Sequence, residues 1–377
     1  MTGTETATDA EAARLDAAID AALAEERLVG GVVTVSRRGE RVYQRAFGLA
    51  DREAERPVTP DTIFRLASVT KPVVCITALR LIEQDEMALD DAVHEWLPDF
   101  RPVGPDGQPA TIRIRHLLTH TSGISYDVAL KGVSTGLAQP GRSLEDNLAR
   151  LAALPLAFAP GASWAYGLSI DVLGAVIQKV TRGSLEEAVR AQVLDPLGLP
   201  ADAFVFSLPR ETPNLAVPYA NDDPRPHRMT GEEQVGETVF DPTRIFDATS
   251  FQAGGAGAAS IAPVIHAILE AVRADAEDGK GRLLSQEMAS AQFRTQSGDL
   301  LTEPGSGFSY MGAVVFDPRI TGLPFAPGTL RWGGVYGHTW FIDSAAAMTV
   351  TIMTNTIYEG VNGKVTVDIR DALYPSR

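Results

Sequence analysis

The pattern of apolar and polar positions divides the chain into two strand-rich ends and a helical middle. Residues 11–27 alternate apolar residues with acids and arginines at helical spacing, which predicts an amphipathic helix. Residues 31–36 and 41–47 read as strands on either side of a turn at Arg38-Gly39-Glu40. The chain therefore begins with a helix and an antiparallel hairpin.

From residue 68 to about 290 the pattern is mostly helical, with loops that contain proline and glycine. Helices are predicted over 68–84, 143–153, 169–182, 184–195 and 260–276. The longest irregular stretch is 202–252, which is rich in Pro, Asp and Asn. A loop of this length in a compact protein usually shapes a binding site or is mobile.

The C-terminal part returns to strands. They are predicted over 308–316, 330–335, 338–343 and 348–354, followed by a helix over about 364–374. We expect the two strand-rich ends to share one antiparallel sheet flanked by the terminal helices, in an α+β fold. This predicts an α/β domain from 1–66 and 295–377, a mostly helical domain inserted at 67–294, and a site at their junction.

Composition and charge narrow the possible functions. The 377 residues are 45% hydrophobic and 21% charged, as in an ordinary globular protein. The net charge of −15 argues against nucleic acid and anionic membranes as partners. A single cysteine, Cys75, excludes a disulfide framework, and no run of 18 apolar residues or signal-like N-terminus occurs. We expect a cytoplasmic protein without a membrane span.

Ser68 and Lys71 form a Ser-x-x-Lys tetrad where an extended segment gives way to a helix. Lys71 lies one turn after Ser68 on the same helix face, so its ammonium group can reach the serine hydroxyl. Only 5 of the 33 Lys and Arg residues are lysines, and lysine, unlike arginine, can lose its proton. The tetrad favours a serine nucleophile with a nitrogen beside it at the positive end of a helix dipole.

Two further stretches could complete such a site. Tyr166 precedes the predicted helix 169–182, where its hydroxyl could be presented into a cleft. Beside a lysine, a tyrosine can act as the proton acceptor for a serine. Trp332-Gly333-Gly334 places two glycines in a strand pattern, which indicates a bulge or a closely approaching ligand. An edge strand there could complete an oxyanion hole with the N–H of Ser68.

In this order, Ser68-Val69-Thr70-Lys71, Tyr166 before Asp171-Val172-Leu173-Gly174, and Trp332-Gly333-Gly334 resemble the β-lactamase-related serine hydrolases. Within them the chain is most similar to the family VIII carboxylesterases, whose fold resembles class C β-lactamases and D,D-peptidases. Residues 115–123 and 254–257 also resemble stretches of this superfamily, and the resemblance spans roughly residues 20–370.

The resemblance implies roles for particular residues. Ser68 would be the acylated nucleophile, Lys71 and Tyr166 would handle protons, and the backbone N–H groups of Ser68 and Val335 would hold the oxyanion. The expected substrate-binding residues are Trp332, Gly333, Gly334, Tyr126, Leu168 and His338. No cofactor or metal is implied, and the expected partner is a small-molecule ester.

Two departures from the β-lactamase pattern bear on the substrate. The β-lactamase Tyr-x-Asn amide is replaced by Leu168, and Trp332-Gly333-Gly334 replaces a Lys-Thr-Gly box that puts a cation near the substrate carboxylate. Both losses favour neutral esters with short to medium acyl chains. A β-lactamase, a D-amino-acid peptidase, an acyltransferase and a penicillin-binding module with slow turnover remain alternatives.

Two other patterns are weaker. Ser134 lies in a Gly-x-Ser-x-Gly sequence, but the nucleophile elbow of α/β-hydrolases needs a buried strand before it and a helix after it. Here the pentad falls in a polar, glycine-rich loop. His116 and His120 have the i, i+4 spacing of metal ligands, but the HExxH glutamate and a third ligand are absent. We therefore expect no metal site.

Overall fold

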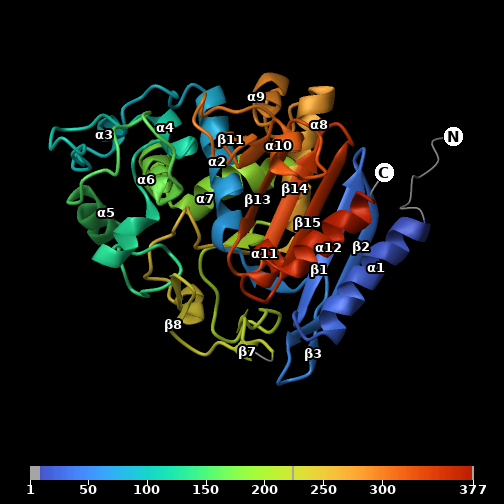
Figure 1. Cartoon of the computed structure of the whole chain (residues 1–377). Coiled ribbons are helices and arrows are strands. Elements are labelled where there is room, and N and C mark those ends of the chain that lie inside the picture. The colour runs from blue at the N-terminus through green and yellow to red at the C-terminus, as the bar shows by residue number, and fades with distance from the viewer. Residues whose placement is uncertain (1–8, 223–224, 376–377) are drawn as a thin grey trace.

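The protein is built on an eight-stranded antiparallel sheet to which both ends of the chain contribute (Figure 1). The computed structural model describes residues 9–222 and 225–375, without the side chains of 128–130. The strands follow the order β11 (Ser306–Phe308), β12 (Ala313–Val315), β13 (Thr329–Gly334), β14 (His338–Asp343), β15 (Met348–Thr354), β1 (Gly30–Arg37), β2 (Glu40–Asp51) and β3 (Arg56–Pro57). Because β1 pairs with β15, the first strand lies beside the last, which confirms the expected shared sheet.

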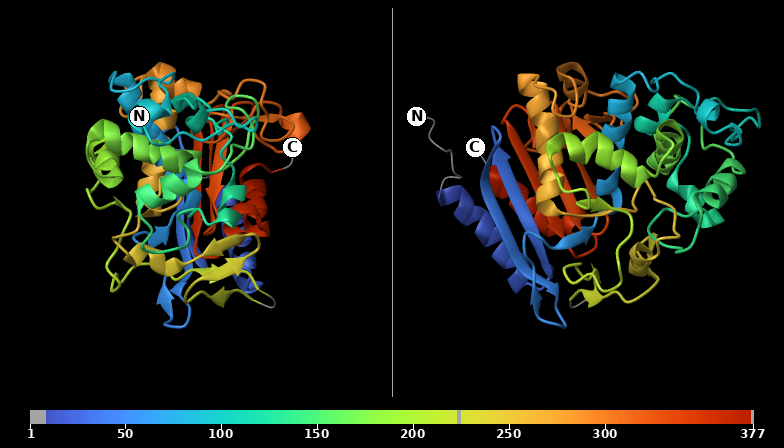
Figure 2. Two further views of the ribbon diagram at one scale, coloured as in Figure 1. Left: turned by 90° about the vertical axis from the view of Figure 1, so that its left-hand side faces the viewer. Right: turned by 180° about the vertical axis from the view of Figure 1, so that it is seen from behind.

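Helices cover both faces of this sheet (Figure 2). On one face α1 (Asp9–Ala24) and α12 (Lys364–Leu373) pack on each other and on the sheet. On the other face α8 (Ala262–Asp278) crosses β1 and β15. Successive strand residues point to opposite faces, so Val33 joins the α1 side and Val32 joins the main core.

The second part of the molecule is a helical region beside the sheet. Its longest helices are α2 (Thr70–Glu83) and α6 (Ser169–Thr181), which pack together. Shorter helices surround them: α3 (Val93–Trp96), α4 (Ile114–Leu118), α5 (Leu144–Ala152) and α7 (Leu185–Val189), which continues into the π-helix η3 (Arg190–Leu194) and the 3-10 helix η4 (Asp195–Leu197). A small sheet, β4 (Ile63–Arg65), β10 (Ala259–Ile261) and β5 (Phe204–Val205), connects this region to the rest.

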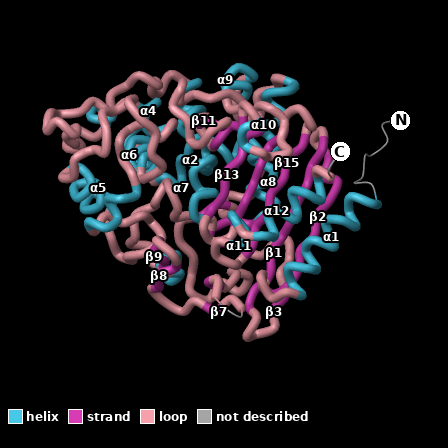
Figure 3. Tube along the Cα trace, viewed as in Figure 1, coloured by secondary structure: helices cyan, strands magenta, loops and turns pink. Residues whose placement is uncertain are grey.

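The predicted long loop 202–252 is mostly irregular, with short elements only (Figure 3). They are β5 at its start, then β6 (Tyr219–Ala220), β7 (His227–Arg228), β8 (Glu233–Val235), β9 (Thr238–Phe240) and the 3-10 helix η5 (Pro242–Phe246). The remaining elements are α9 (Gln286–Ala291), α10 (Pro318–Thr321), α11 (Glu359–Asn362) and the 3-10 helices η1 (Ala67–Val69) and η2 (Tyr126–Lys131). No helix among the described residues is both long enough and apolar enough to cross a bilayer.

One expectation is corrected. The single strand predicted over 308–316 is a hairpin of β11 and β12, because the hydroxyl of Ser309 accepts hydrogen bonds from the N–H groups of Met311 and Gly312 and closes a turn. The domain boundary at 294 stays a prediction; it groups α8 with the helical domain, and α8 also contacts β1 and β15 of the sheet. The apolar periodicity of α8 shows that one face is buried, but it does not show whether that face packs on the sheet or on other helices.

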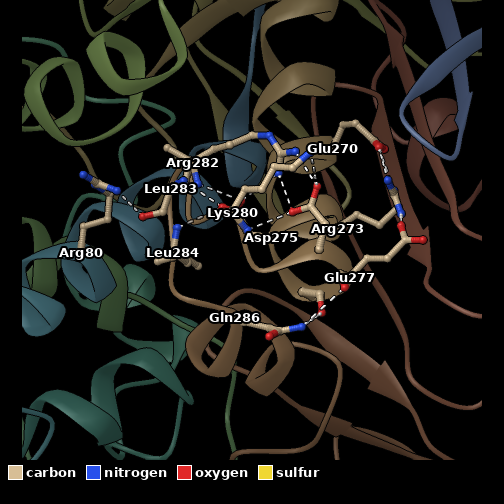
Figure 4. A network of polar contacts seen from close by, with 12 residues as sticks. Arg80, Glu270, Arg273, Asp275, Glu277, Lys280, Arg282, Leu283, Leu284 and Gln286 are labelled. Carbon is tan, nitrogen blue, oxygen red and sulfur yellow. Dashed lines mark hydrogen bonds and ion pairs between the residues drawn. The ribbon is translucent and has the colours of Figure 1, made fainter.

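A buried polar network ties the C-terminal end of α2 to α8 (Figure 4). Asp275, in α8, has no exposed surface, and its carboxylate accepts hydrogen bonds from the N–H groups of Arg282, Leu283 and Leu284 at 2.8 to 3.1 Å. The guanidinium of Arg282 adds a fourth at 3.0 Å, and the guanidinium of Arg80, in α2, donates to the carbonyl of Leu283. The helix that begins near Ser68 is therefore anchored at its far end.

Candidate active site

Ser68 sits in a turn that redirects the chain from strand β4 into helix α2. Ala67 has a positive φ of 45°, a left-handed conformation that costs about 1–2 kcal/mol for a residue with a Cβ. The N–H of Leu66, just before it, donates to the carbonyl of Ala258 at 2.8 Å and fixes the approach. Backbone strain of this kind is often found at functional sites. Ser68 itself is 7% exposed.

The ammonium group of Lys71 lies at the centre of the site. It donates to the Ser68 hydroxyl at 3.2 Å, to the Tyr126 hydroxyl at 3.1 Å and to the Gly255 carbonyl at 2.7 Å. A lysine ammonium has three N–H donors, so these contacts use all of them. Burial by itself lowers the pKa of Lys71, but nearby Tyr126, Tyr166 and the Asp171 carboxylate outweigh burial and raise that pKa. Lys71 is therefore a buried cation at neutral pH.

Tyr166 lies beside Lys71, with its ring centroid 4.7 Å from the lysine nitrogen. Its hydroxyl oxygen accepts a hydrogen bond from the indole N–H of Trp332 at 3.0 Å. The preceding residue is held in place, because the N–H of Ala165 donates to the carbonyl of His120. Two tyrosines thus flank the Ser68–Lys71 pair. Burial raises the pKa of Tyr126, so its hydroxyl stays protonated.

Aromatic rings form an apolar wall next to these groups. Trp332 packs on Tyr166 at a centroid distance of 4.8 Å and edge-on to Phe308 at 5.3 Å. Trp164 stacks on Tyr166 at 6.5 Å and also contacts Phe308. The sequence reasoning did not single out Trp164 or Phe308. The only indication in the sequence that Trp164 lies near the site is its position two residues before Tyr166.

The end of β13 runs directly beside the Ser68 turn. A Cβ added at Gly334 would lie 2.3 Å from the carbonyl oxygen of Leu66, so a side chain there would push the strand away from the Ser68 turn. A Cβ at Gly333 would lie 2.6 Å from the carbonyl of His338. The pairing of β13 with β12 ends at Arg331, whereas its pairing with β14 continues to Gly334. The glycines therefore allow a local strand edge, followed by Val335, to approach Ser68.

Leu168 and His338, two of the expected substrate-binding residues, lie away from the cleft surface. Leu168 has no exposed surface and belongs to the main core just before α6. His338 is 1% exposed, and its Nε2 is 2.7 Å from the carbonyl of Arg65. Burial lowers the pKa of His338 to about 4, so the ring is neutral and Nε2 donates its proton to that carbonyl. Both side chains are buried, and their expected part in substrate binding stays a prediction.

Neither weaker sequence pattern forms a site. Ser134 is 2% exposed, and its hydroxyl donates to the carbonyl of Ala138 within a turn, without the strand and helix of a nucleophile elbow. His116 accepts a hydrogen bond from the N–H of Arg113, while His120 is buried and its ring packs on Tyr166. In the part of the chain that the structure describes, no group of three or more potential metal ligands occurs.

Asp171 and Gly255 form a further contact, to which the sequence reasoning gave no role. Asp171 is 4% exposed, in the first turn of α6, and its Oδ1 accepts a hydrogen bond from the N–H of Gly255 at 3.1 Å. Burial raises the pKa of Asp171 to about 6, although Lys71 and the Gly255 N–H oppose this shift. The signal in the sequence was an acid among apolar residues at the start of a helix.

Comparison with known proteins adds an independent line of support. Residues 15–373 match the family model described as "Beta-lactamase". The chain is 46% identical to "Esterase EstB" of Burkholderia gladioli, over 96% of this chain and 95% of that protein.

Solved structures agree with the fold. The structure described as "EstCE1, a hydrolase with promiscuous acyltransferase activity" superposes with a TM-score of 0.91 at 36% identity, covering 97% of this chain and 98% of the other. Unliganded simvastatin synthase from Aspergillus terreus has a TM-score of 0.74 at 22% identity, with 98% of each chain covered. The latter likeness is one of fold alone. Together they confirm the predicted β-lactamase-like α+β architecture.

Proposed function

Since the chain belongs to the beta-lactamase family, we propose that it is a carboxylesterase that hydrolyses neutral esters through an acyl-enzyme on Ser68. The observation that carries this proposal is the contact between the Ser68 hydroxyl and the buried Lys71 ammonium, 3.2 Å apart beside an aromatic wall. The 46% identical esterase and the 36% identical hydrolase support the reaction class.

In the proposed acylation, the Ser68 oxygen attacks the ester carbonyl carbon. Tyr166 would act here as a phenolate, which the Trp332 N–H and the nearby Lys71 charge stabilise, and its oxygen accepts the serine proton to become a hydroxyl. The carbonyl oxygen becomes an oxyanion that the backbone N–H groups of Ser68 and Val335 would bind. The tetrahedral intermediate then expels the alkoxide, which takes the proton from Tyr166 and leaves as the alcohol.

Deacylation repeats these steps with water. A water molecule gives a proton to the tyrosine oxygen and attacks the acyl carbon, and Ser68 leaves with that proton. Throughout, Lys71 would remain an ammonium that orients the serine hydroxyl and stabilises negative charge on its neighbours. Tyr126, whose hydroxyl lies 3.1 Å from the same ammonium, stays protonated because burial raises its pKa, and it would help to hold Lys71 in place.

The lining of the site supports a neutral, largely apolar substrate. Trp332, Tyr126 and Tyr166 present rings beside the nucleophile. Trp332 stands where β-lactamases carry a cation, and a carboxylate buried without a partner loses several kcal/mol. Short to medium acyl chains in neutral esters fit this surface better than anionic β-lactams or peptides. The net charge of −15 likewise supports a small neutral partner over nucleic acid.

One relative favours a second activity at the same site. The 36% identical hydrolase is described as having promiscuous acyltransferase activity. Transfer would follow the same acylation of Ser68, after which an alcohol rather than water would accept the acyl group. Measuring the partition of the acyl-enzyme between water and added alcohol would decide between the two.

A substrate panel tests the proposal. We expect p-nitrophenyl butyrate to be cleaved faster than benzylpenicillin by roughly 10³-fold or more in kcat/KM. The Ser68→Ala variant is the matched control for hydrolysis outside the site. Equal rates with benzylpenicillin and the butyrate ester would contradict the proposal and favour the β-lactamase alternative.

A further inference from the structure

Asp171 is linked to Lys71 through one intervening residue, Gly255. Its Oδ1 accepts the N–H of Gly255 at 3.1 Å, and the carbonyl of the same glycine accepts the Lys71 ammonium at 2.7 Å. The second carboxylate oxygen, Oδ2, is buried and has no hydrogen-bond partner among the described residues. The carboxylate is therefore not fully satisfied by the fold, unlike most buried carboxylates.

The backbone of Gly255 is packed closely against Asp171. A Cβ added at Gly255 would lie 2.3 Å from Asp171 Oδ2, and one at Gly254 would lie 2.6 Å from the carbonyl of Ile170. The first turn of α6 thus packs directly against two consecutive glycines. The position at 255 leaves room for the peptide but for no side chain.

We propose that Asp171 is a positioning residue of the esterase site, which holds the Gly255 carbonyl against Lys71 and supplies the negative charge that keeps this ammonium protonated. This inference rests on the proposed function of Ser68 and Lys71. Asp171 does not touch the reacting atoms. It acts on Lys71 through the backbone of Gly255 and through electrostatic attraction.

The charges around Asp171 make its ionisation state consequential. Lys71 from α2 and Arg244 from η5 face it with positive charge, and Tyr126 from η2 lies near enough to interact. Burial raises the pKa of Asp171 to about 6. The carboxylate is therefore ionised at pH 8 and neutral at pH 5, and the negative charge opposite Lys71 is lost as the pH falls.

The test is the pH dependence of kcat/KM for p-nitrophenyl butyrate in wild type and in Asp171→Asn. Asparagine keeps an oxygen for the Gly255 N–H but carries no charge. We expect kcat at pH 8 to fall roughly 10- to 100-fold, as for a displaced catalytic group, with a smaller change in KM. The acid limb near pH 6 should disappear, and the alkaline limb should move to lower pH because Lys71 has lost a stabilising negative charge.

A matched control separates positioning from loss of folding. Asp275→Asn removes another fully buried carboxylate, in the network of Figure 4, where its hydrogen-bond partners are Arg282, Leu283 and Leu284. It should lower the melting temperature and leave both limbs of the pH profile in place. Limbs that stay unmoved in Asp171→Asn, at any level of activity, would overturn the proposal.

Wild-type protein alone supplies a second measurement, which decides the matter if Asp171→Asn does not fold. The rate at which a fluorophosphonate modifies the wild-type protein should fall as the pH drops through about 6. A constant rate from pH 5 to pH 8 would overturn the role of Asp171. Failure of the proposed function would look different, since the wild type would then hydrolyse no ester or Ser68→Ala would match it.

Discussion

Asp171 and Asp275 are both buried aspartates near helix α2, yet their surroundings differ. Asp275 has no exposed surface and accepts four hydrogen bonds, one of them from the Arg282 guanidinium. Asp171 is 4% exposed and has a single described partner at Oδ1, with Oδ2 left unpaired. The carboxylate of Asp275 is thus fully paired, whereas that of Asp171, which is linked to Lys71 through Gly255, keeps one oxygen without a partner among the described residues.

The same contrast extends to the two ends of helix α2. At its start, Lys71 is a buried cation surrounded by a serine, a tyrosine and a carbonyl rather than by a paired carboxylate. At its end, Arg80 donates to the Leu283 carbonyl within the Asp275 network. The start of the helix carries the proposed proton-transfer groups, and its end is anchored to the Asp275 network. Variants at the two ends should therefore fail in different ways.

The largest expected effect is on turnover at the start of α2. Lys71→Ala and Tyr166→Phe should each lower kcat by roughly 10²–10⁴-fold without unfolding the protein. Because the two groups would act as a unit, the double variant should be little slower than either single one. Steady-state kinetics measures this, with Lys364→Ala, at a 58% exposed lysine paired with Asp368, as the control.

Tyr126→Phe sharpens the same comparison. If Tyr166 accepts the serine proton, Tyr126→Phe removes only one contact of Lys71 and should cost roughly tenfold, in line with one lost hydrogen bond to a charged group. A larger loss for Tyr126→Phe than for Tyr166→Phe would reverse the two roles. Additive losses in the Lys71 and Tyr166 double variant would show that they work independently.

A smaller effect, on stability alone, is expected at the other end. In Asp275→Asn an amide NH₂ faces the N–H groups that the carboxylate accepted, so donors oppose donors. We expect the free energy of unfolding to fall by about 3 kcal/mol, a typical cost for breaking a buried charged network. Urea unfolding measures this loss. A kcat per folded molecule that also fell tenfold would mean that the two regions are not separate.

The smallest effect concerns stability at Asp171 and has the opposite sign. The pKa of Asp171 is about 6 in the folded protein and near 4 in an unfolded chain, so folding favours the neutral acid. This group's contribution to stability therefore decreases as pH rises from about 4 to 6, and above that the ionised carboxylate is a net cost. Asp171→Asn should gain on the order of 1 kcal/mol at pH 8 and nothing at pH 5.

Thermal unfolding of Asp171→Asn and wild type at the two pH values measures this difference. If Asp171→Asn is less stable than wild type at pH 8 but equally stable at pH 5, the ionised carboxylate stabilises the fold. The contrast with Asp275 would then disappear.

What could be predicted from the sequence follows the range of the interactions. Ser68 and Lys71 are three residues apart on one helix, so their contact follows from local geometry. The strands β14 and β15 and the shared sheet were also predicted, because their patterning is local and strong. The contact of Lys71 with Tyr126 spans 55 residues and that of Asp171 with Gly255 spans 84, and no local periodicity encodes either.

The positions of Leu168 and His338 also depend on contacts between distant segments. Leu168 was assigned to the cleft from its position in a motif, but the entry of the chain into α6 turns this side chain into the core. His338 follows the two glycines in sequence, yet β14 directs its ring toward Phe64 beneath the site. In each case the side of the backbone on which a side chain lies is set by packing between distant segments.

The most direct test is to identify the residue that acts as the nucleophile. Wild-type protein treated with a fluorophosphonate should gain one adduct per chain, and peptide mass spectrometry should place it on Ser68. Ser68→Ala should gain none and should lose about three orders of magnitude or more in kcat with p-nitrophenyl butyrate. An adduct on any other residue, such as Ser134, or near-normal activity of Ser68→Ala would contradict the account.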